Sequence, residues 1–396
     1  MRGINTLTKN KKKHNDDFPN RGNKIKFFIK KNRYYLIIMF LVIGIISVVT
    51  FNIKHFSKYT NTENNISSRN AVEDKSIDYK TIKPNEAGDV MVIMYHSIDN
   101  KAKHFPWHRN KKEFKEDLEY MYKNGYVLIS MKEYLSNDIN IPAGKTPILL
   151  TFDDGLKSCF SLIKNKEGKL VVNNDTLIGI LEEFKSEHPD FGSGGVLYIT
   201  ENPFDYDAYY NNKTEGDYQD KFRVLTDLGY EIGNHTYHHY NMNNLNKNEI
   251  MEEIGKVNNL VYKNNNKIPT SYLAYPYGDK PKEENLKAVK NGEYKGVKYK
   301  MQSAVLAAPE PPYFTNPINK DFDPYYISRA IANSGQHMDM YWYFKYYKKH
   351  PEKKYISDGD NTILSIPANY KKNVNPEKTK SFKTVFYDTK TYETIE

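Results

Sequence analysis

The stretch TPILLTFDDG, residues 146–155, decides the fold class of this chain of 396 residues. Its first seven residues form an apolar and β-branched run that predicts a buried strand. Two adjacent carboxylates, Asp153 and Asp154, follow at the carboxyl end of the strand, where the functional residues of α/β folds lie. Ionising two neighbouring carboxylates is costly unless a cation is present. Taken alone, the stretch fits an Asp-Gly turn with a helix N-cap equally well.

Strands and helices alternate along most of the chain around this stretch. Strand patterns occupy residues 90–95, 126–130, 194–200, 230–236 and 271–276. Helical patterns occupy residues 113–125, 175–188, 220–229 and 246–265. This alternation predicts an α/β fold with a mostly parallel sheet or a (β/α) barrel. Nearer the C-terminus the chain becomes rich in Lys and Asn, and residues 362–366 and 383–388 are candidate terminal strands.

The positive charge of the chain lies in its N-terminal tail. The formal net charge is +9, and residues 1–33 contain 11 Lys or Arg against 2 Asp or Glu. The remaining residues contain 47 side chains of each sign, so their net charge is zero. A nucleic-acid-binding protein carries its basic footprint on the folded domain. We therefore expect no nucleic-acid partner.

A segment of 20 residues without charge, residues 34–53, follows the basic tail. It is long enough to cross a hydrocarbon core of about 30 Å. Cationic flanks stay in the cytoplasm, so the chain after this segment is expected outside. The long leader and the lack of a small-x-small cleavage site favour an uncleaved signal anchor over a cleaved signal peptide. The sequence thus predicts a single-pass protein of the cell membrane with a cytoplasmic N-terminus.

The sequence NHTYHH, residues 234–239, places three histidines within five residues directly after a predicted strand. Two histidines and one carboxylate, with water, form a recurrent open site for zinc. Alone, such a cluster could be polar surface sequence. Together with the two aspartates of residues 146–155, it favours a metal site, which explains both motifs better than packing does.

A third motif, AYPYG at residues 274–278, also follows a predicted strand. A Pro-x-Gly turn can point a backbone N–H into a pocket, as stabilisation of an oxyanion requires. Taken alone, an ordinary tight turn is the simpler interpretation.

The motifs TFDDG, NHTYHH and YPYG, in this order and spacing, resemble the polysaccharide deacetylase family with the NodB homology domain, carbohydrate esterase family 4. The resemblance covers roughly Val90 to Ala332. It implies a distorted (β/α) barrel, here preceded by one transmembrane helix. It also implies an enzyme that removes N-acetyl groups from amino-sugar polymers with a divalent metal, commonly zinc.

The resemblance assigns the metal ligands and the base. The family pattern H-[ST]-x-x-H selects His235 and His239 as ligands, with Asp154, and leaves His238 as the spare histidine. Asp153 then becomes the general base that accepts a proton from the attacking water. The metal would acidify that water and polarise the acetamide carbonyl.

The third motif departs from the family pattern. It implies that Pro276 and Tyr277 lie against the substrate, with the backbone N–H of Tyr277 helping to hold the oxyanion. The family often begins this motif with an Arg that orients the catalytic Asp, and here that position is Ala274. Arg329, which we group with the substrate-binding residues, could supply a guanidinium from elsewhere; an ordinary surface salt bridge explains it equally well.

The general acid is also displaced from its usual place in the sequence. The expected late Leu-x-His motif has its nearest counterpart in residues 363–366, which lack histidine. His96, at the end of the first predicted strand of the domain, is the candidate acid, since a pKa near neutrality suits that role. Deacetylases of poly-N-acetylglucosamine exopolysaccharides resemble this arrangement, with a permuted motif order. The alternative is a histidine bonded to a local backbone carbonyl.

The sequence therefore predicts a membrane-anchored extracellular metal-dependent polysaccharide deacetylase, acting on a poly-N-acetylglucosamine-type exopolysaccharide. Peptidoglycan is the alternative substrate, and a non-catalytic glycan-binding module on the same fold is the alternative function. The expected organisation is a cytoplasmic tail (1–33), the anchor (34–53), an extracellular linker (54–87), the deacetylase domain (88–347) and a C-terminal extension (348–396) of unassigned role.

Overall fold

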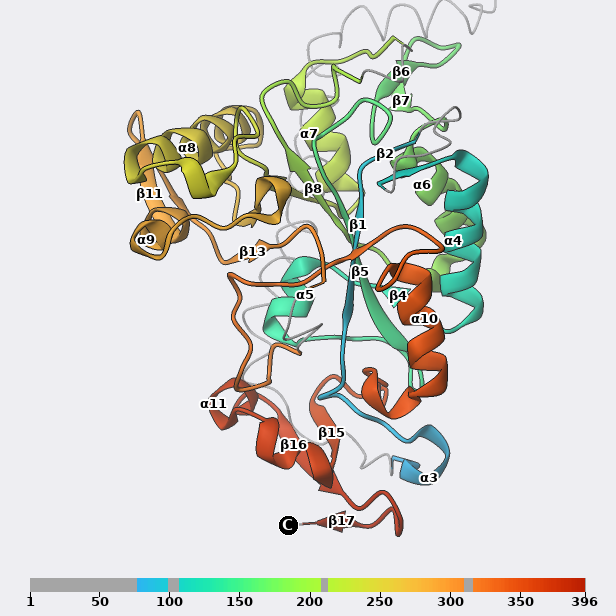
Figure 1. The fold of residues 1–396 in the computed structure, drawn as a ribbon. Helices are drawn as coiled ribbons and strands as arrows, with labels where there is room; N and C mark the ends of the chain where they lie inside the picture. Colours follow the sequence, from blue (N-terminus) through green and yellow to red (C-terminus); the bar gives the residue numbers. More distant parts are fainter. Residues whose placement is uncertain (1–76, 99–106, 208–212, 310–315, 396) are drawn as a thin grey trace, which may run out of the picture. The chain divides into compact units, whose positions relative to one another are not determined.

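A sheet of parallel strands forms the centre of the protein in the computed structural model (Figure 1), which describes residues 77–98, 107–207, 213–309 and 316–395. Every residue of two of its central strands is buried, as expected where both faces of a parallel sheet are covered. The strands are β1 (Met91–Tyr95), β4 (Tyr126–Leu128), β5 (Thr146–Phe152), β8 (Val196–Ile199), β9 (Glu231–Asn234), β10 (Tyr272–Ala274), β13 (Ser303–Val305) and β14 (Ala330–Ile331).

The order of the strands across the sheet is β13-β10-β9-β8-β5-β1-β14, with β4 pairing with β5 off this path. The segment that leads into β14 also reaches the opposite edge, because Ile327 forms a parallel bridge with Val305 of β13. The sheet is therefore curled into a half-barrel. The predicted parallel α/β fold is confirmed, and this shape is consistent with the predicted distorted barrel.

Amphipathic helices cover the sheet. In Figure 1, α4, α6 and α10 lie along one side of it and α8 and α9 along the other. Both α4 and α8 begin at an asparagine, Asn110 and Asn246, whose side chain accepts from the backbone N–H three residues later in a capping box. The helices are α4 (Lys111–Lys123), α5 (Met131–Ser136), α6 (Leu177–Glu187), α7 (Tyr218–Asp227), α8 (Lys247–Asn264), α9 (Leu286–Lys290) and α10 (Met340–Lys349).

Several short strands lie outside the central sheet. They form the parallel pair β2 (Ser97–Ile98) and β3 (His108–Arg109), and two antiparallel pairs. The antiparallel pairs are β6 (Leu162–Lys164) with β7 (Leu170–Val172), and β11 (Asn291–Tyr294) with β12 (Val297–Lys300). These pairs were not predicted, since their strands are only two to four residues long.

The C-terminal residues form a three-stranded sheet, made of β15 (Ile363–Pro367), β16 (Lys383–Tyr387) and β17 (Thr394–Ile395). This sheet packs with the residues before β1, which include α3 (Tyr79–Ile82); the short helix α11 (Pro376–Thr379) precedes β16. Glu86 accepts a hydrogen bond from the Ser365 N–H at 2.9 Å, and the Tyr387 hydroxyl donates to the Pro84 carbonyl at 2.8 Å.

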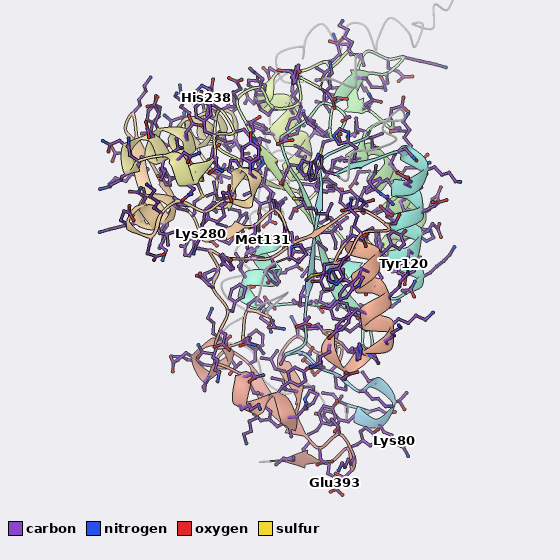
Figure 2. All side chains as sticks on the ribbon, in the orientation of Figure 1. Lys80, Tyr120, Met131, His238, Lys280 and Glu393 are labelled. Atoms are coloured by element: carbon purple, nitrogen blue, oxygen red, sulfur yellow. The ribbon has the colours of Figure 1, made fainter. Side chains whose placement is uncertain are left out.

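These contacts extend the folded unit beyond the predicted domain boundaries. Residues 77–396 form one compact unit, which includes the end of the expected linker and the whole C-terminal extension. Lys80 and Glu393 lie near each other at one end of this unit, whereas His238 lies at the opposite end (Figure 2).

The predicted tail, the anchor and most of the linker lie outside the described residues. Among the residues that the structure does describe, no helix has the length and apolar character needed to cross a membrane.

Candidate active site

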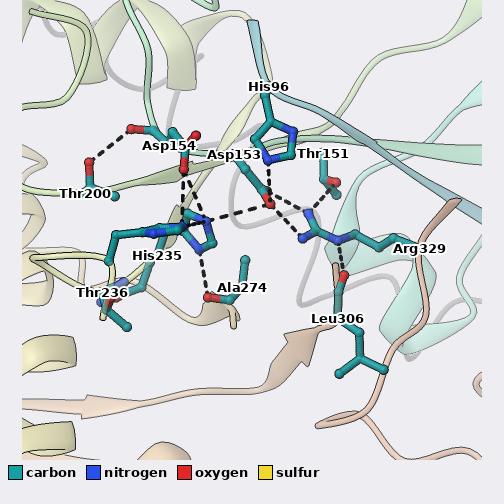
Figure 3. Close-up of polar contacts among 12 residues, drawn as sticks. His96, Thr151, Asp153, Asp154, Thr200, His235, Thr236, Ala274, Leu306 and Arg329 are labelled. Carbon is teal, nitrogen blue, oxygen red and sulfur yellow. Dashed lines mark hydrogen bonds and ion pairs between the residues drawn. The ribbon is translucent and has the colours of Figure 1, made fainter. Parts of the chain in front are cut away.

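The predicted site residues converge at the carboxyl ends of the central strands (Figure 3). β1 and β5 pair with Tyr95 opposite Phe152, so the residues that follow, His96 and Asp153, lie side by side. β9 lies two strands from β5, beyond β8, and its last residue precedes His235. Parallel pairing therefore brings together residues that are far apart in the sequence.

Asp154, His235 and His239 form the one group suited to a metal ion among the described residues. Nε2 of His235 lies 3.2 Å from Nε2 of His239, and Oδ1 of Asp154 lies 3.4 Å and 3.5 Å from these two nitrogens. Ligand atoms about 2.1 Å from a tetrahedral zinc ion lie roughly 3.4 Å from one another. The spacing and the donor set both fit a divalent metal such as zinc.

The His235 ring has its metal-facing tautomer fixed by the backbone. Its Nδ1 lies 2.9 Å from the carbonyl oxygen of Ala274, at the end of β10. Because a carbonyl only accepts hydrogen bonds, Nδ1 carries the proton and Nε2 keeps its lone pair for a metal. Ala274 stands where the family often has an arginine, and its backbone serves the site regardless of the side chain.

Left-handed backbone conformations gather at this site. Asp154, Thr236, His239 and Tyr277 all have positive φ angles, between 56° and 69°. Each such conformation costs a non-glycine residue about 1–3 kcal/mol and persists only where surrounding contacts hold it. Four such conformations in or beside the metal-binding group indicate that the backbone is held in a strained form that directs these side chains into the site.

Arg329 holds Asp153 in place from the side away from His235, as Figure 3 shows. Its Nη1 and Nη2 donate to the two carboxylate oxygens of Asp153 at 2.6 and 2.7 Å. Its Nη1 also donates to the Thr151 hydroxyl at 3.0 Å, and its Nε donates to the Leu306 carbonyl. The arginine is thus oriented by the central strand β5 and by Leu306, which directly follows the edge strand β13.

This position corrects the assignment of Arg329 to substrate binding. The side chain is 0% exposed and lies beneath Asp153, so it has no surface to offer a polymer. It supplies instead the guanidinium missing at position 274, and it is not a surface salt bridge. Of the two other residues predicted to bind substrate, Pro276 is buried and Tyr277 is exposed.

The charges around Asp153 keep it ionised. Burial by itself raises its pKa, but the positive charge of Arg329 and nearby His235 outweighs burial and holds the pKa below its usual range. Burial likewise raises the pKa of Asp154, but the close contact with His235 and the neighbouring imidazoles outweigh burial and hold that pKa below its usual range. Both carboxylates are therefore charged at neutral pH, as a base and a metal ligand must be.

His96 lies on the other side of Asp153. Its Nε2 is 4.0 Å from Oδ2 of Asp153, and its Nδ1 is buried without a hydrogen-bond partner in the part of the chain that the structure describes. A bond to a local backbone carbonyl, the alternative to an acid role, is therefore not present among these residues. Burial lowers the pKa of His96, although the two aspartates partly offset this effect.

A cavity of about 630 Å³ opens beside the metal-binding group. It extends past Asp154 and His239, and Thr200, Glu201, Asn202 and Tyr206 line its wall. The exposed aromatic residues surround the same region. Trp107, Tyr206, Tyr240 and Tyr277 are 43–66% exposed, and each of them lines the cavity or contacts one of His96, His238 and His239.

Several residues that shape the site escaped the sequence analysis. Thr151 and the carbonyls of Ala274 and Leu306 act through contacts whose partners lie on other strands. Glu253, on α8, contacts His238, and nothing in the local pattern of a helix distinguishes it from its neighbours.

Part of the chain is similar in sequence to a known protein family. Residues 140–297 match the family model described as polysaccharide deacetylase. A search of the curated proteins found no match.

Three solved structures are similar to this chain at low identity. A polysaccharide deacetylase from Bacillus anthracis shares 21% identity (TM-score 0.44, covering 61% of this chain and 64% of that one). One from Bacillus cereus shares 18% (TM-score 0.47, 65% and 68%), and IcaB from Ammonifex degensii shares 15% (TM-score 0.40, 61% and 91%). The chain thus spans about two thirds of the length of the two Bacillus proteins.

Proposed function

Because residues 140–297 match the polysaccharide deacetylase family, we propose that the chain is a member of this family and removes N-acetyl groups from a poly-N-acetylglucosamine-type exopolysaccharide outside the cell. As a member of the family it is a metal-dependent hydrolase that acts on carbon–nitrogen bonds. The observation that carries the proposal is Asp153, held ionised by Arg329 between His96 and the metal-binding group.

The polymer would enter the cavity beside the metal-binding group. Exposed aromatic rings such as Trp107 and Tyr206 can pack against the apolar faces of sugar rings. Asp154, His235 and His239 would hold the divalent metal. When bound there, the metal supplies a Lewis acid for the acetamide oxygen and makes water a better nucleophile at neutral pH.

The remaining chemistry belongs to the side chains of Asp153 and His96. Asp153 accepts a proton from the attacking water, whose oxygen bonds to the acyl carbon. His96 donates a proton to the amide nitrogen as the carbon–nitrogen bond breaks, so that acetate and a free amine leave. Because burial lowers the pKa of His96, its protonated form is a stronger acid than a free histidine. Arg329 keeps the Asp153 carboxylate oriented during both steps.

The position of His96 supports the exopolysaccharide as the substrate class. The expected late histidine motif is absent from residues 363–366, and β15 carries those residues into the C-terminal sheet instead. His96, from the first strand of the central sheet, takes its place beside Asp153. A glycan-binding module would have no use for a base beside a metal site, so the complete set of side chains favours an enzyme.

Acetate release from three polymers tests the function. The purified, zinc-loaded protein is given β-1,6-linked N-acetylglucosamine oligomers, chitin oligomers and peptidoglycan, with the Asp153→Asn variant as control. The proposal expects release that is fastest from the β-1,6-linked oligomers and absent in the variant. Faster release from peptidoglycan would identify peptidoglycan as the substrate in place of the exopolysaccharide. No release from a protein that binds zinc, with retained binding to one of the polymers, would favour the glycan-binding module.

Membrane anchoring and an extracellular catalytic domain are part of the proposal. They are supported by the uncharged segment 34–53 and the basic tail before it. Fractionation of cells that express a C-terminally tagged chain tests both points. We expect the tag in the membrane fraction and its removal when protease is added to intact cells. A tag that stays protected in intact cells, yet is cleaved after lysis, would contradict the orientation.

A further inference from the structure

The loop that carries two of the metal-binding histidines is held from outside the site by an acidic residue of α8. Glu253 is 4% exposed and accepts a hydrogen bond from the backbone N–H of His238 at 2.7 Å through Oε2. Its other oxygen, Oε1, lies 2.7 Å from Nδ1 of the His238 ring. One carboxylate thus binds both the backbone and the side chain of a residue that is not itself a metal ligand.

This loop needs external support because its backbone is strained. Thr236 and His239 both adopt left-handed conformations, with φ of 59° and 56°. The helix α8 holds the start of the loop as well as its end, since the Asn234 side chain donates to the Ile254 carbonyl at 2.9 Å and accepts from the Thr236 N–H at 2.9 Å. Glu253 and Ile254 are consecutive residues, so one turn of α8 fixes both ends.

The two metal-binding histidines are supported differently. The His235 ring is oriented directly, through Nδ1 and the Ala274 carbonyl. Nδ1 of His239 makes no such bond among the described residues; its Nε2 lies beside the other two ligands, and its ring packs against the ring of Tyr277. The direction of the His239 side chain therefore depends on its backbone, and the peptide preceding it is linked to Glu253 through His238.

We propose that Glu253, acting through His238, is a positioning residue that sets the metal affinity and the ligand geometry of this site. The inference rests on the proposed function, because it takes Asp154, His235 and His239 as the metal ligands. Hydrogen-bonding partners outside the ligand set commonly change metal affinity by about 10–100-fold. Glu253 differs from such partners in acting on the loop backbone rather than on a ligand ring.

A matched pair of variants tests the proposal. Glu253→Gln removes the negative charge and one of the two acceptor oxygens that contact His238. Glu252→Gln makes the same change on the neighbouring residue, whose exposed side chain pairs with Lys256 at 2.8 Å. The measurements are the zinc dissociation constant by chelator competition, the visible absorption spectrum of the cobalt-loaded protein, and thermal unfolding of the metal-free protein.

We expect Glu253→Gln to weaken zinc binding by about 10–100-fold and to alter the cobalt spectrum, with metal-free unfolding close to that of the parent protein. Glu252→Gln should bind zinc within about two-fold of the parent and keep its spectrum. If Glu253→Gln binds zinc as tightly as Glu252→Gln and gives the same spectrum, the proposal is overturned. If the parent protein binds neither zinc nor cobalt, the proposed function fails, and this inference fails with it.

A second substitution covers the case in which Glu253→Gln does not fold. His238→Ala removes the ring that Oε1 of Glu253 contacts, yet it keeps the backbone N–H. We expect a smaller loss of zinc affinity, together with an altered cobalt spectrum. Unchanged affinity and an unchanged spectrum in His238→Ala would overturn the positioning role of the Glu253–His238 pair.

Discussion

Arg329 donates hydrogen bonds at 2.6 and 2.7 Å to the two carboxylate oxygens of Asp153, although 176 positions separate the residues in the chain. Both side chains are buried, and the pairing holds the pKa of Asp153 below its usual range against the effect of burial. A planar guanidinium binds a carboxylate at two points, which fixes its orientation as well as its charge. The reactivity of the proposed base therefore depends on Arg329.

Replacing Arg329 by Lys should shift the pH dependence of activity. A lysine keeps a positive charge but loses the two-point geometry, so the pKa of Asp153 should rise. Because the base must be ionised, the acidic limb of the kcat/KM profile should move to higher pH. The profile of acetate release measures the shift, and Arg223→Lys, an exposed pair on α7, is the control. An unchanged acidic limb in Arg329→Lys would show that Arg329 does not set the pKa of the base.

Replacing Asp153 by Asn should remove turnover while leaving the metal bound. The amide has nearly the shape of the carboxylate but cannot accept the proton, so we expect a loss of at least about 100-fold in kcat. Asp154, His235 and His239 are untouched, so zinc should remain stoichiometric. Acetate release and elemental analysis measure the two effects, with the exposed Asp175→Asn as control. Persisting turnover would mean that another group is the base.

Replacing His235 by Ala should remove the metal together with the activity. Its Nε2 is one of three ligand atoms, and the two that remain are too few to hold zinc tightly. Metal content after dialysis is the measurement. His350→Ala, at a histidine that is 47% exposed, should keep its metal. Stoichiometric zinc in His235→Ala would rule out its role as a ligand.

Replacing His96 by Gln should lower the rate of deacetylation by at least about 100-fold, because the leaving amine then lacks its proton donor. Metal content should not change, since His96 is not a member of the ligand group. The same substitution at exposed His337 is the control. A rate close to that of the parent protein would assign the acid role to a different group.

Replacing Asp358 by Asn should make the stability of the folded unit less sensitive to rising pH. Burial raises the pKa of Glu86 well above its usual range, the charge of Asp358 adds to this effect, and burial also raises the pKa of Asp358. Carboxyls with raised folded-state pKa values favour folding at low pH, and their contribution is lost as the pH rises above their unfolded values. The parent protein should therefore lose stability through this pair as the pH rises, and the variant should lose less.

Urea unfolding at a series of pH values measures this difference. Other ionisable groups affect both proteins alike, so the difference between the two free energies of unfolding isolates the Glu86–Asp358 pair. A difference that does not change with pH would show that these carboxyls keep ordinary pKa values in the folded protein.

The sequence predicted the elements of the fold because their signals are local. The apolar run before Asp153 became β5, and the helical pattern at 246–265 became α8, each within two residues of its predicted bounds. The strands β13 and β14, of three and two residues, carry too few side chains for a recognisable period and were missed. The pairing of the C-terminal sheet with residues 77–89 was missed because it joins segments nearly 280 positions apart.

For the site, the sequence by itself determined the chemical types of the side chains and the strand ends that carry them. It did so because Asp153, Asp154 and the histidines of 234–239 directly follow recognisable strands. Only the tertiary structure decided which of these groups meet. Parallel pairing of β1 and β5 sets His96 beside Asp153, and the curling of the sheet brings Arg329 beneath it. Such contacts depend on strand order and sheet curvature, which no local stretch of residues specifies.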